Sequence, residues 1–452
     1  MKNRIINREI FGWIAYDWAN SAFYTTVITV LVGPYLQALA VADVGENGMV
    51  LDLGILGGLT PKTMFTFSLV IANVTQAFFL PVLGALADYT HLKKKLLMLF
   101  SYSGVLFGGL MFFVKGDDYL FGYFFLIFSN MSFVAANVLY NAFLNDVAEP
   151  ESRDRVSSWG YAAGYFGGGV MLVANLLLIN FHDSLGLEKG DAVRISMLAA
   201  SLWWGLFGLV TFITLRERQP STSLPQNKTF LTIGFAEVWK TLLELKGLKY
   251  TLIFLLGYLL YNDGIQTVIA NSSVYLANEL FISKGEQTDE AFLLGIFLVA
   301  QFCAFLGALV FERIARVIGA KGTILFCLFI WVNIVVYAYG FMHDRHQAWF
   351  LGAGIGLVLG STQALSRSLF SKMIPKGREA AFFSIYELSE RGTSWIGNLV
   401  FGVVVVYTGS FRQAILALIF FFVSGSIMLI FTDVQRAMRE AAMRSAVDAR
   451  EA

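Results

Sequence analysis

Apolar stretches long enough to cross a lipid bilayer recur along the whole chain. A helix needs about 20 mainly apolar residues to span the hydrocarbon core of a membrane. Only 14% of the 452 residues are charged and 57% are hydrophobic, whereas about 25% of the residues in an ordinary soluble protein are charged. We therefore expect an all-α membrane protein, and a soluble enzyme is excluded. Twelve predicted spans lie at residues 11–36, 63–87, 96–114, 120–143, 158–181, 195–215, 249–277, 291–312, 323–342, 348–371, 381–406 and 413–432.

A polar segment divides the twelve spans into two sets of six. It contains Pro220 and Pro225 among serines and threonines, and its later part, residues 233–245, has the pattern of a short amphipathic helix. The residues after the last span are rich in Ala, Arg and Glu and are expected to form a cytoplasmic helix. The predicted regions are an N-terminal six-helix bundle (1–215), a cytoplasmic central loop (216–248), a C-terminal six-helix bundle (249–432) and a cytoplasmic tail (433–452).

The distribution of Lys and Arg predicts the orientation in the membrane. If the N-terminus lies in the cytoplasm, 24 of the 33 Lys and Arg residues fall in cytoplasmic segments and seven fall outside. The remaining two, Arg367 and Arg391, lie within spans. Cytoplasmic loops of membrane proteins carry an excess of positive charge. We therefore expect both termini in the cytoplasm, and the compact loops favour the plasma membrane of a prokaryote.

The two halves of the chain share short sequence patterns. Gly84–Leu86 at the end of the second span recurs as Gly307–Leu309 at the end of the eighth. Internal duplication is common in transporters and predicts two pseudo-symmetric bundles. A second pattern lies between the fourth and fifth spans and recurs between the tenth and eleventh: Pro150, Arg153 and Tyr161 match Pro375, Arg378 and Tyr386.

Charged residues within the spans are the first candidates for a functional site. A charge in the hydrocarbon core costs at least about 2.5–3.5 kcal/mol on insertion scales, so each one requires an explanation. Both signs occur, which suits a zwitterionic substrate or internal ion pairs, and buried carboxylates can bind and release a coupling proton. The candidates are Asp17, Asp263, Arg367, Glu387, Glu390 and Arg391.

Asp263 is the strongest candidate for binding a substrate or a coupling ion. It lies 14 residues into the seventh span, which at 1.5 Å per residue is about 21 Å from the cytoplasmic end and near the middle of the bilayer. Asn262 and Gln266 make the neighbouring stretch polar. The alternative is a carboxylate that only stabilises helix packing.

Asp17 and Arg367 lie at similar depths in the cytoplasmic half of the membrane. A pair between these residues would join the two halves and would break when a cavity opens toward the cytoplasm, so a role in gating is one interpretation. A static ion pair and direct contact with a substrate are the alternatives. Asn20 and Tyr24 continue the polar character of the first span toward the predicted cavity.

Two further helices carry polar residues with helical spacing. Glu387 and Arg391 are four residues apart, so they share a helix face and can form an intrahelical ion pair, with a proton relay as the alternative. Asn137 and Asn141 share a face of the fourth span. They can bind a substrate or form hydrogen bonds with neighbouring helices.

Several of these residues lie in motifs of a known family. Gly84–Asp88, followed by Lys93–Lys95, resembles the loop 2–3 motif of the major facilitator superfamily. The segments YDWANSAF (Tyr16–Phe23), YNAFL (Tyr140–Leu144) and QALSRS (Gln363–Ser368) resemble the vacuole-effluxer-like group, whose eukaryotic members export amino acids from the vacuole. The resemblance covers essentially the whole chain. It implies two six-helix bundles around a central cavity lined mainly by spans one, four, seven and ten, with transport by rocking of the bundles.

The resemblance and the residues together predict two sets of site residues. The residues expected to bind substrate or the coupling ion are Asp17, Asn20, Tyr24, Asn137, Asn141, Asn262, Asp263, Gln266, Gln363 and Arg367. The residues expected to act in gating are Gly84, Asp88, Lys93, Arg153, Glu387 and Arg391.

These features predict a secondary active transporter that moves small organic solutes by alternating access. The resemblance implies amino acids as substrates, and proton-coupled efflux or exchange is our hypothesis. The sequence contains no G-x-x-x-x-G-K-[ST] loop, which disfavours direct ATP drive. The two cysteines and four histidines are scattered and the net charge is +1, so we expect no cofactor, no metal site and no nucleic-acid partner.

The expected partners are a small-molecule substrate, protons and the lipid bilayer. The protein is expected to be a monomer, and we do not expect it to be an enzyme. Alternatives stay open at this point. A multidrug or lipid exporter would have the same fold, and an intramembrane lipid-handling enzyme would need a nucleophile with its base, or a metal cluster, within the spans. The family resemblance also leaves the vacuolar membrane as an alternative location.

Overall fold

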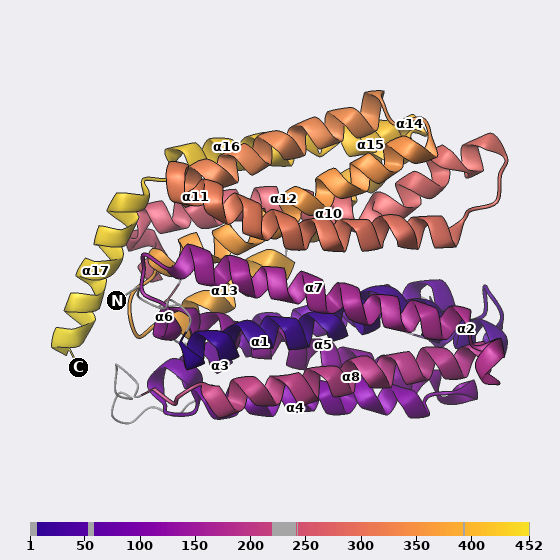
Figure 1. The fold of residues 1–452 in the computed structure, drawn as a ribbon, viewed down its shortest axis with the longest axis horizontal. Coiled ribbons are helices and arrows are strands. Elements are labelled where there is room, and N and C mark those ends of the chain that lie inside the picture. Colours follow the sequence, from indigo (N-terminus) through magenta and orange to yellow (C-terminus); the bar gives the residue numbers. More distant parts are fainter. Residues whose placement is uncertain (1–6, 53–57, 219–240, 242, 392–393, 452) are drawn as a thin grey trace.

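The computed structural model describes residues 7–52, 58–218, 241, 243–391 and 394–451. Nearly all of them are helical. The bilayer core offers no water to bind backbone N–H and C=O groups, so apolar segments satisfy these groups within a helix. The helices lie roughly parallel in two bundles, an N half (α1–α8) and a C half (α10–α16), with α17 beyond one end of both (Figure 1). We refer to this end as the α17 end.

The N half consists of eight α-helices and a π-helical segment, η1, that continues α1. Short 3-10 turns and one pair of two-residue strands connect some of them. The bounds are α1 Arg8–Phe23, η1 Tyr24–Leu31, α2 Val32–Val44, β1 Leu51–Asp52, β2 Gly58–Leu59, α3 Pro61–Tyr89, α4 Lys93–Leu110, η3 Met111–Phe113, η4 Gly116–Asp118, α5 Tyr119–Ala142, α6 Leu144–Val147, α7 Arg153–Asn180, η5 Asp183–Leu185 and α8 Lys189–Thr214.

The C half and the tail contain α10 Lys249–Leu280, η6 Ile282–Lys284, α11 Glu290–Gly340, α12 Arg345–Lys372, α13 Glu379–Arg391, α14 Ser394–Thr408, α15 Phe411–Ala417, α16 Ile419–Phe431 and α17 Val434–Glu451. The 51-residue α11 comprises two helices that meet at Gly319, whose φ of 79° and ψ of 159° are not helical. Such a φ is accessible to glycine at little cost because glycine has no Cβ. The chain reverses there at the α17 end (Figure 1).

The helices account for the predicted spans. Within the described residues, ten helical segments are long and apolar enough to cross a membrane. One of them, Ala291–Gly340, contains two predicted spans on either side of Gly319, and Ile396–Thr408 is a shorter apolar helix. A helix therefore lies at each of the twelve predicted positions.

Several boundaries differ from those predicted. The first span extends to Val44, and the connection that follows it includes the antiparallel pair β1 and β2. The eleventh predicted span contains α13 and α14, and residues 392–393 between them lie outside the described residues.

The two regions outside the spans had been predicted to be helical. The tail forms the helix α17. Most of the helix predicted at 233–245 lies outside the described residues, although 241 and 243–247 are helical.

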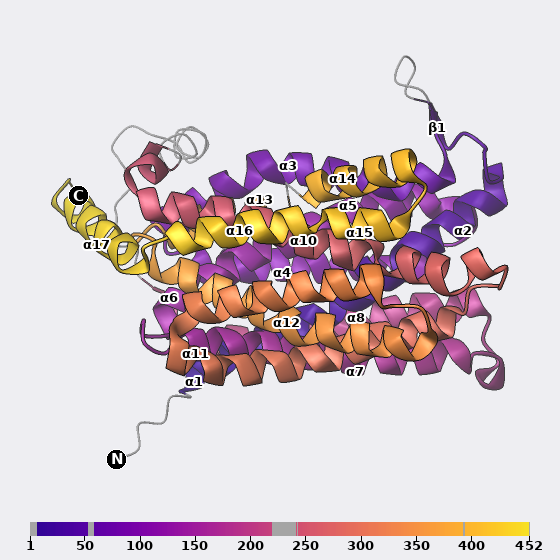
Figure 2. The same ribbon diagram turned by 90° about the horizontal axis from the view of Figure 1, so that it is seen from above.

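Helices α1, α3, α5 and α7 of the N half contact α11, α12 and α13 of the C half. Helix α13 packs against α3 and α5, and α7 packs against α11 and α12. Figure 2 shows α13 beside α3. Hydrogen bonds also join the halves. Among the described residues, these bonds lie near the α17 end or in the middle of the helices, and none lies at the opposite end. The structure is therefore closed at the α17 end.

Candidate functional site

A buried arginine of the C half is surrounded by polar groups of the N half. Arg367, on α12, is only 2% exposed. Its Nε donates to Ser157 Oγ at 2.9 Å, and its Nη2 donates to the Ser157 carbonyl at 3.0 Å. Nη2 also forms an ion pair with Asp17 Oδ2 at 3.2 Å, and Nη1 donates to Asn141 Oδ1 at 3.2 Å. The planar guanidinium thus joins α12 to α1, α5 and α7.

Three aromatic rings surround the same guanidinium. Its carbon lies 4.2 Å from the ring centre of Tyr161, 4.7 Å from that of Trp13 and 5.5 Å from that of Tyr140. Tyr140 also donates its hydroxyl to Asp17 Oδ2 at 2.7 Å. Aromatic faces attract cations, and the attraction is greater where water is excluded. The positive charge of Arg367 is therefore balanced without solvent.

Asn141 extends this network to a second carboxylate. Its Oδ1 accepts from Arg367, and its Nδ2 donates to Glu387 Oε1 at 2.7 Å. An amide is suited to this position because one end accepts and the other donates. We refer to Asp17, Asn141, Ser157, Arg367 and Glu387 as the Arg367 cluster. The predicted pair between Glu387 and Arg391 depends on the Arg391 side chain, which lies outside the described residues.

A second contact between the halves lies at the start of α13. Asp88, at the end of α3, accepts from the backbone N–H groups of Ala380 at 2.9 Å and Ala381 at 2.8 Å. The first N–H groups of a helix have no partner within that helix and carry a partial positive charge, so a carboxylate stabilises them. Gly84 permits the close approach, because a Cβ on this residue would lie 2.7 Å from the Ala380 carbonyl oxygen.

We predict that Gly84→Ala weakens the contact between α3 and α13. The added methyl group requires these helices to move apart, and overpacking of this kind costs about 1–3 kcal/mol. The thermal unfolding midpoint of the purified protein is expected to fall. Gly109→Ala is the matched control, since a Cβ at Gly109 would be 3.6 Å from Leu198, an ordinary contact. Equal midpoints for the two variants would contradict the prediction.

The other two predicted gating residues make different kinds of contact. Lys93 forms an ion pair with Asp146 at 3.1 Å, within the N half. Arg153 joins the halves, because its Nη1 donates to the Ser371 carbonyl at 2.8 Å while its Nε donates to the Ala148 carbonyl at 3.1 Å. Only Arg153 of this pair links the two bundles directly.

Charged residues next to Arg153 add further links. Asp154 accepts from Ser368 Oγ at 2.5 Å and forms an ion pair with Lys372 at 2.7 Å. Arg155 forms an ion pair with Glu312 at 3.3 Å. The first turn of α7 therefore contacts both α12 and α11.

The remaining candidates of the N half lie nearer the middle of the bundle. Asn20 donates from Nδ2 to Asn137 Oδ1 at 2.9 Å, and the Tyr24 ring stacks on Phe133 at 4.8 Å. Gln363 of the C half accepts from the Tyr165 hydroxyl at 2.5 Å. These residues are not hydrogen-bonded to Arg367.

The candidates on α10 lie apart from the Arg367 cluster. Asn262 donates from Nδ2 to the Glu390 carbonyl at 3.2 Å, and Asp263 Oδ2 accepts from the Gly397 N–H at 2.8 Å. Gln266 is half-buried on the same helix. The polar residues of α10 therefore contact α13 and α14.

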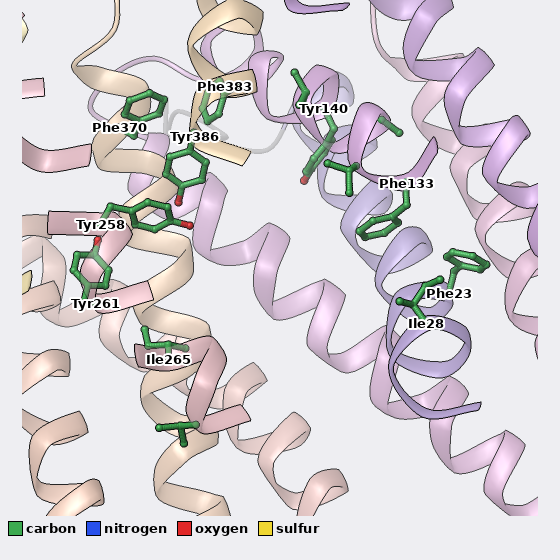
Figure 3. Packing of buried hydrophobic residues seen from close by; sticks show 14 of the residues in the cluster. Phe23, Ile28, Phe133, Tyr140, Tyr258, Tyr261, Ile265, Phe370, Phe383 and Tyr386 are labelled. Carbon is green, nitrogen blue, oxygen red and sulfur yellow. The ribbon is translucent and has the colours of Figure 1, made fainter. Parts of the chain in front are cut away.

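An aromatic group near α10 faces the N half. Tyr258 stacks on Tyr386 at 4.3 Å, and its hydroxyl donates to Glu390 Oε2 at 3.1 Å. The hydroxyl group of Tyr258 points toward the N half, where Tyr140 lies, and that of Tyr386 points toward Tyr258 (Figure 3).

Sequence reasoning missed several residues of the Arg367 cluster and its surroundings. Ser157, Trp13 and Asp154 were not candidates, and nothing in the sequence distinguishes them from other residues at helix ends. Tyr140 was part of a family motif, and Tyr161 was a position of the internal repeat. Those two signals were available to identify the aromatic neighbours. Among the described residues, no group of three or more His, Cys, Asp or Glu side chains is placed to hold a metal ion.

Comparison with known proteins agrees with this architecture. The model of a family described as vacuole effluxer Atg22 like matches residues 6–442. The chain belongs to this family. An uncharacterized MFS-type transporter, YxiO, from Bacillus subtilis is 29% identical, over 93% of this chain and 94% of the relative. Autophagy-related protein 22 from Kluyveromyces lactis is 24% identical, over 96% of this chain and 95% of the relative.

Solved structures of the major facilitator superfamily share the fold of this Atg22-like chain. The transporter FucP in its outward conformation aligns with a TM-score of 0.68 at 12% identity, covering 94% of this chain and 98% of FucP. A bacterial homologue of the iron transporter ferroportin, in an outward-facing state, aligns with a TM-score of 0.63 at 13% identity, covering 94% and 98%. The family and the fold together identify the chain as a multi-pass membrane transporter, which is not an enzyme.

Proposed function

We propose that this protein is a secondary active transporter that exports amino acids by alternating access, and that its α17 end faces the cytoplasm. The observation that carries the proposal is the Arg367 cluster, in which a buried cation of one half is held by an anion of the other. The excess of Lys and Arg in the predicted cytoplasmic segments supports the orientation. We further propose a monomer in the plasma membrane of a prokaryote.

The cluster suits a contact that forms in one conformation and is broken in the other. In the closed arrangement, Arg367 uses Nε, Nη1 and Nη2 in hydrogen bonds to the N half. Opening at the α17 end separates α12 from α1, α5 and α7 and exposes these groups to the cavity. A transporter needs such an element with two discrete states, whose populations a ligand can shift.

The exposed groups match the chemistry of an amino acid. Opening leaves the Arg367 guanidinium on one wall and the Asp17 carboxylate on the other. A guanidinium binds a carboxylate with two parallel hydrogen bonds, and a carboxylate binds an ammonium group. A zwitterionic amino acid replaces both partners of the broken pair, so its binding compensates for the lost contact. This reasoning favours amino acids over neutral drugs or lipids.

We propose that protons are coupled to this movement through Asp17 and Glu387. A protonated Asp17 no longer balances the charge of Arg367, so proton binding favours separation of the halves. An imposed pH gradient is expected to drive amino-acid accumulation in proteoliposomes. Accumulation that is unchanged when a protonophore removes the gradient would refute proton coupling and leave exchange as the mechanism.

Counterflow tests the substrate class without an assumed driving force. Proteoliposomes are preloaded with an unlabelled amino-acid mixture and diluted into a solution of one radiolabelled amino acid. We expect transient accumulation of label for the transported amino acids and none in protein-free liposomes. A folded protein that exchanges no amino acid would remove the proposed substrate class and favour the multidrug or lipid exporter.

A further inference from the structure

Asp263 is a buried carboxylate with an incomplete set of partners. It is 1% exposed, and its Oδ2 accepts from the Gly397 N–H in the first turn of α14. Its Oδ1 accepts no hydrogen bond and, within the described part of the chain, no Lys, Arg or His forms an ion pair with it. Asp17, by contrast, has both Tyr140 and Arg367. A buried charge without a partner is unfavourable, so an ionised Asp263 needs a bound cation, and otherwise the carboxyl group is protonated.

Thr267, one helical turn from Asp263, has a second buried oxygen without a hydrogen-bond partner among the described residues. Its side chain is fully buried, and its Oγ1 has no hydrogen-bond partner in the described structure. Other hydroxyl groups in these helices donate to the carbonyl four residues earlier, as Ser272 and Thr362 do. Thr267 Oγ1 instead lies against Gly397, where a Cβ would be 2.2 Å from it. Asp263 and Thr267 therefore converge on the same point of α14.

Asn262 supplies a third oxygen. Its Nδ2 is occupied by the Glu390 carbonyl in the last turn of α13, so its amide orientation is fixed. The remaining Oδ1 is buried and has no donor among the described residues. Three acceptor oxygens without donors thus occupy two successive turns of α10, beside the end of α13 and the start of α14.

We propose that Asp263, Thr267 and Asn262 bind a sodium ion. Hard cations prefer carboxylate, carbonyl and hydroxyl oxygens, and one carboxylate suits a single positive charge. A proton on Asp263 can be shared with only one further oxygen, whereas a hard cation takes several oxygen ligands at once.

Sodium at this position would join α10 to α14. Helix α14 follows α13, which carries Glu387 and whose first turn binds Asp88. Occupancy of the site would thus favour one arrangement of the helices that close the α17 end. This inference rests on the proposed function for its role as a second coupling ion, beside the proton at the Arg367 cluster. Binding itself does not depend on that role.

Sodium binding can be measured on the purified full-length protein without any transported solute. Choline is replaced stepwise by Na⁺ at constant ionic strength and pH, and thermal unfolding is followed by tryptophan fluorescence. We expect a saturable rise in the midpoint, because a ligand that binds only the folded state stabilises it by mass action. Equilibrium binding of radioactive sodium to the same preparation gives the dissociation constant.

Two variants locate the site. Asp263→Asn and Thr267→Val are each expected to raise the sodium dissociation constant at least about tenfold, since loss of even an indirect partner of a metal costs 10–100-fold in affinity. Thr267→Val keeps the shape of the side chain and remains informative if Asp263→Asn does not fold. Ser272→Ala, on the same helix, is the matched control, because its hydroxyl bonds within α10.

The possible results separate the alternatives. A wild-type protein with no sodium-dependent shift and no bound sodium would overturn the proposal, as would equal sodium affinity in Thr267→Val and wild type. Stabilisation that follows pH and not Na⁺ would also overturn it and assign Asp263 to proton binding. Failure of amino-acid counterflow would not affect these results, so the two proposals fail independently.

Discussion

Asp17→Asn is expected to open the protein at the α17 end. The substitution keeps the size of the side chain and its acceptor for Tyr140 but removes the charge that balances Arg367. Breaking a buried ion pair by removing one partner costs roughly 3–5 kcal/mol. Because the cost falls on the closed arrangement, the ratio of closed to open molecules should fall at least about a hundredfold.

Distances between spin labels measure this shift. Lys95→Cys and Val317→Cys place labels at the α17 end of each half, on exposed positions outside the Arg367 cluster, after the native Cys303 and Cys327 are replaced by alanine. Asp17→Asn should lengthen the main distance. In the double variant Asp17→Asn with Arg367→Gln, the main distance should differ from that of wild type by less than the summed changes of the two single variants. An unchanged distance in Asp17→Asn would mean that this pair does not hold the end closed.

Arg367→Lys is expected to lower the initial rate of exchange in proteoliposomes at least about a hundredfold, although the positive charge is kept. Arginine uses a planar fork of donors, whereas lysine offers a compact ammonium group on a flexible chain, so the two are not equivalent at such a site. Lysine can pair with Asp17 but cannot also reach Asn141 and both oxygens of Ser157 with the same geometry.

The control for this variant is Arg345→Lys. Arg345 is half exposed and pairs with Glu286, which is also exposed, and pairs of this kind contribute only about 0–1 kcal/mol. Its exchange rate should stay within about fivefold of wild type by the same estimate. Both variants must unfold at a temperature close to that of wild type. Transport by Arg367→Lys at the wild-type rate would show that charge alone is sufficient and that the hydrogen bonds of the cluster are not required.

The sequence predicted the positions of the spans well, because the length requirement of a bilayer is local and acts on each segment separately. The same local cost identified the charged residues within spans, and counting residues from the span ends placed Asp17 and Arg367 at matching depths. Boundaries were less well predicted. The first helical segment, for example, continues to Val44, beyond the predicted end at residue 36.

The tertiary structure alone decided which of these residues meet. The direction of a side chain around its helix, and the identity of the facing helix, depend on how all the helices pack. No local pattern shows that Asn141 bridges Arg367 to Glu387, that Ser157 accepts from the guanidinium, or that Asp263 faces Gly397. The sequence by itself therefore determined the membrane class, the spans and the charged candidates, through the cost of placing each residue in hydrocarbon. Packing between the two halves decided the partners of those candidates and the end at which the protein is closed, because both depend on contacts between residues far apart in the chain.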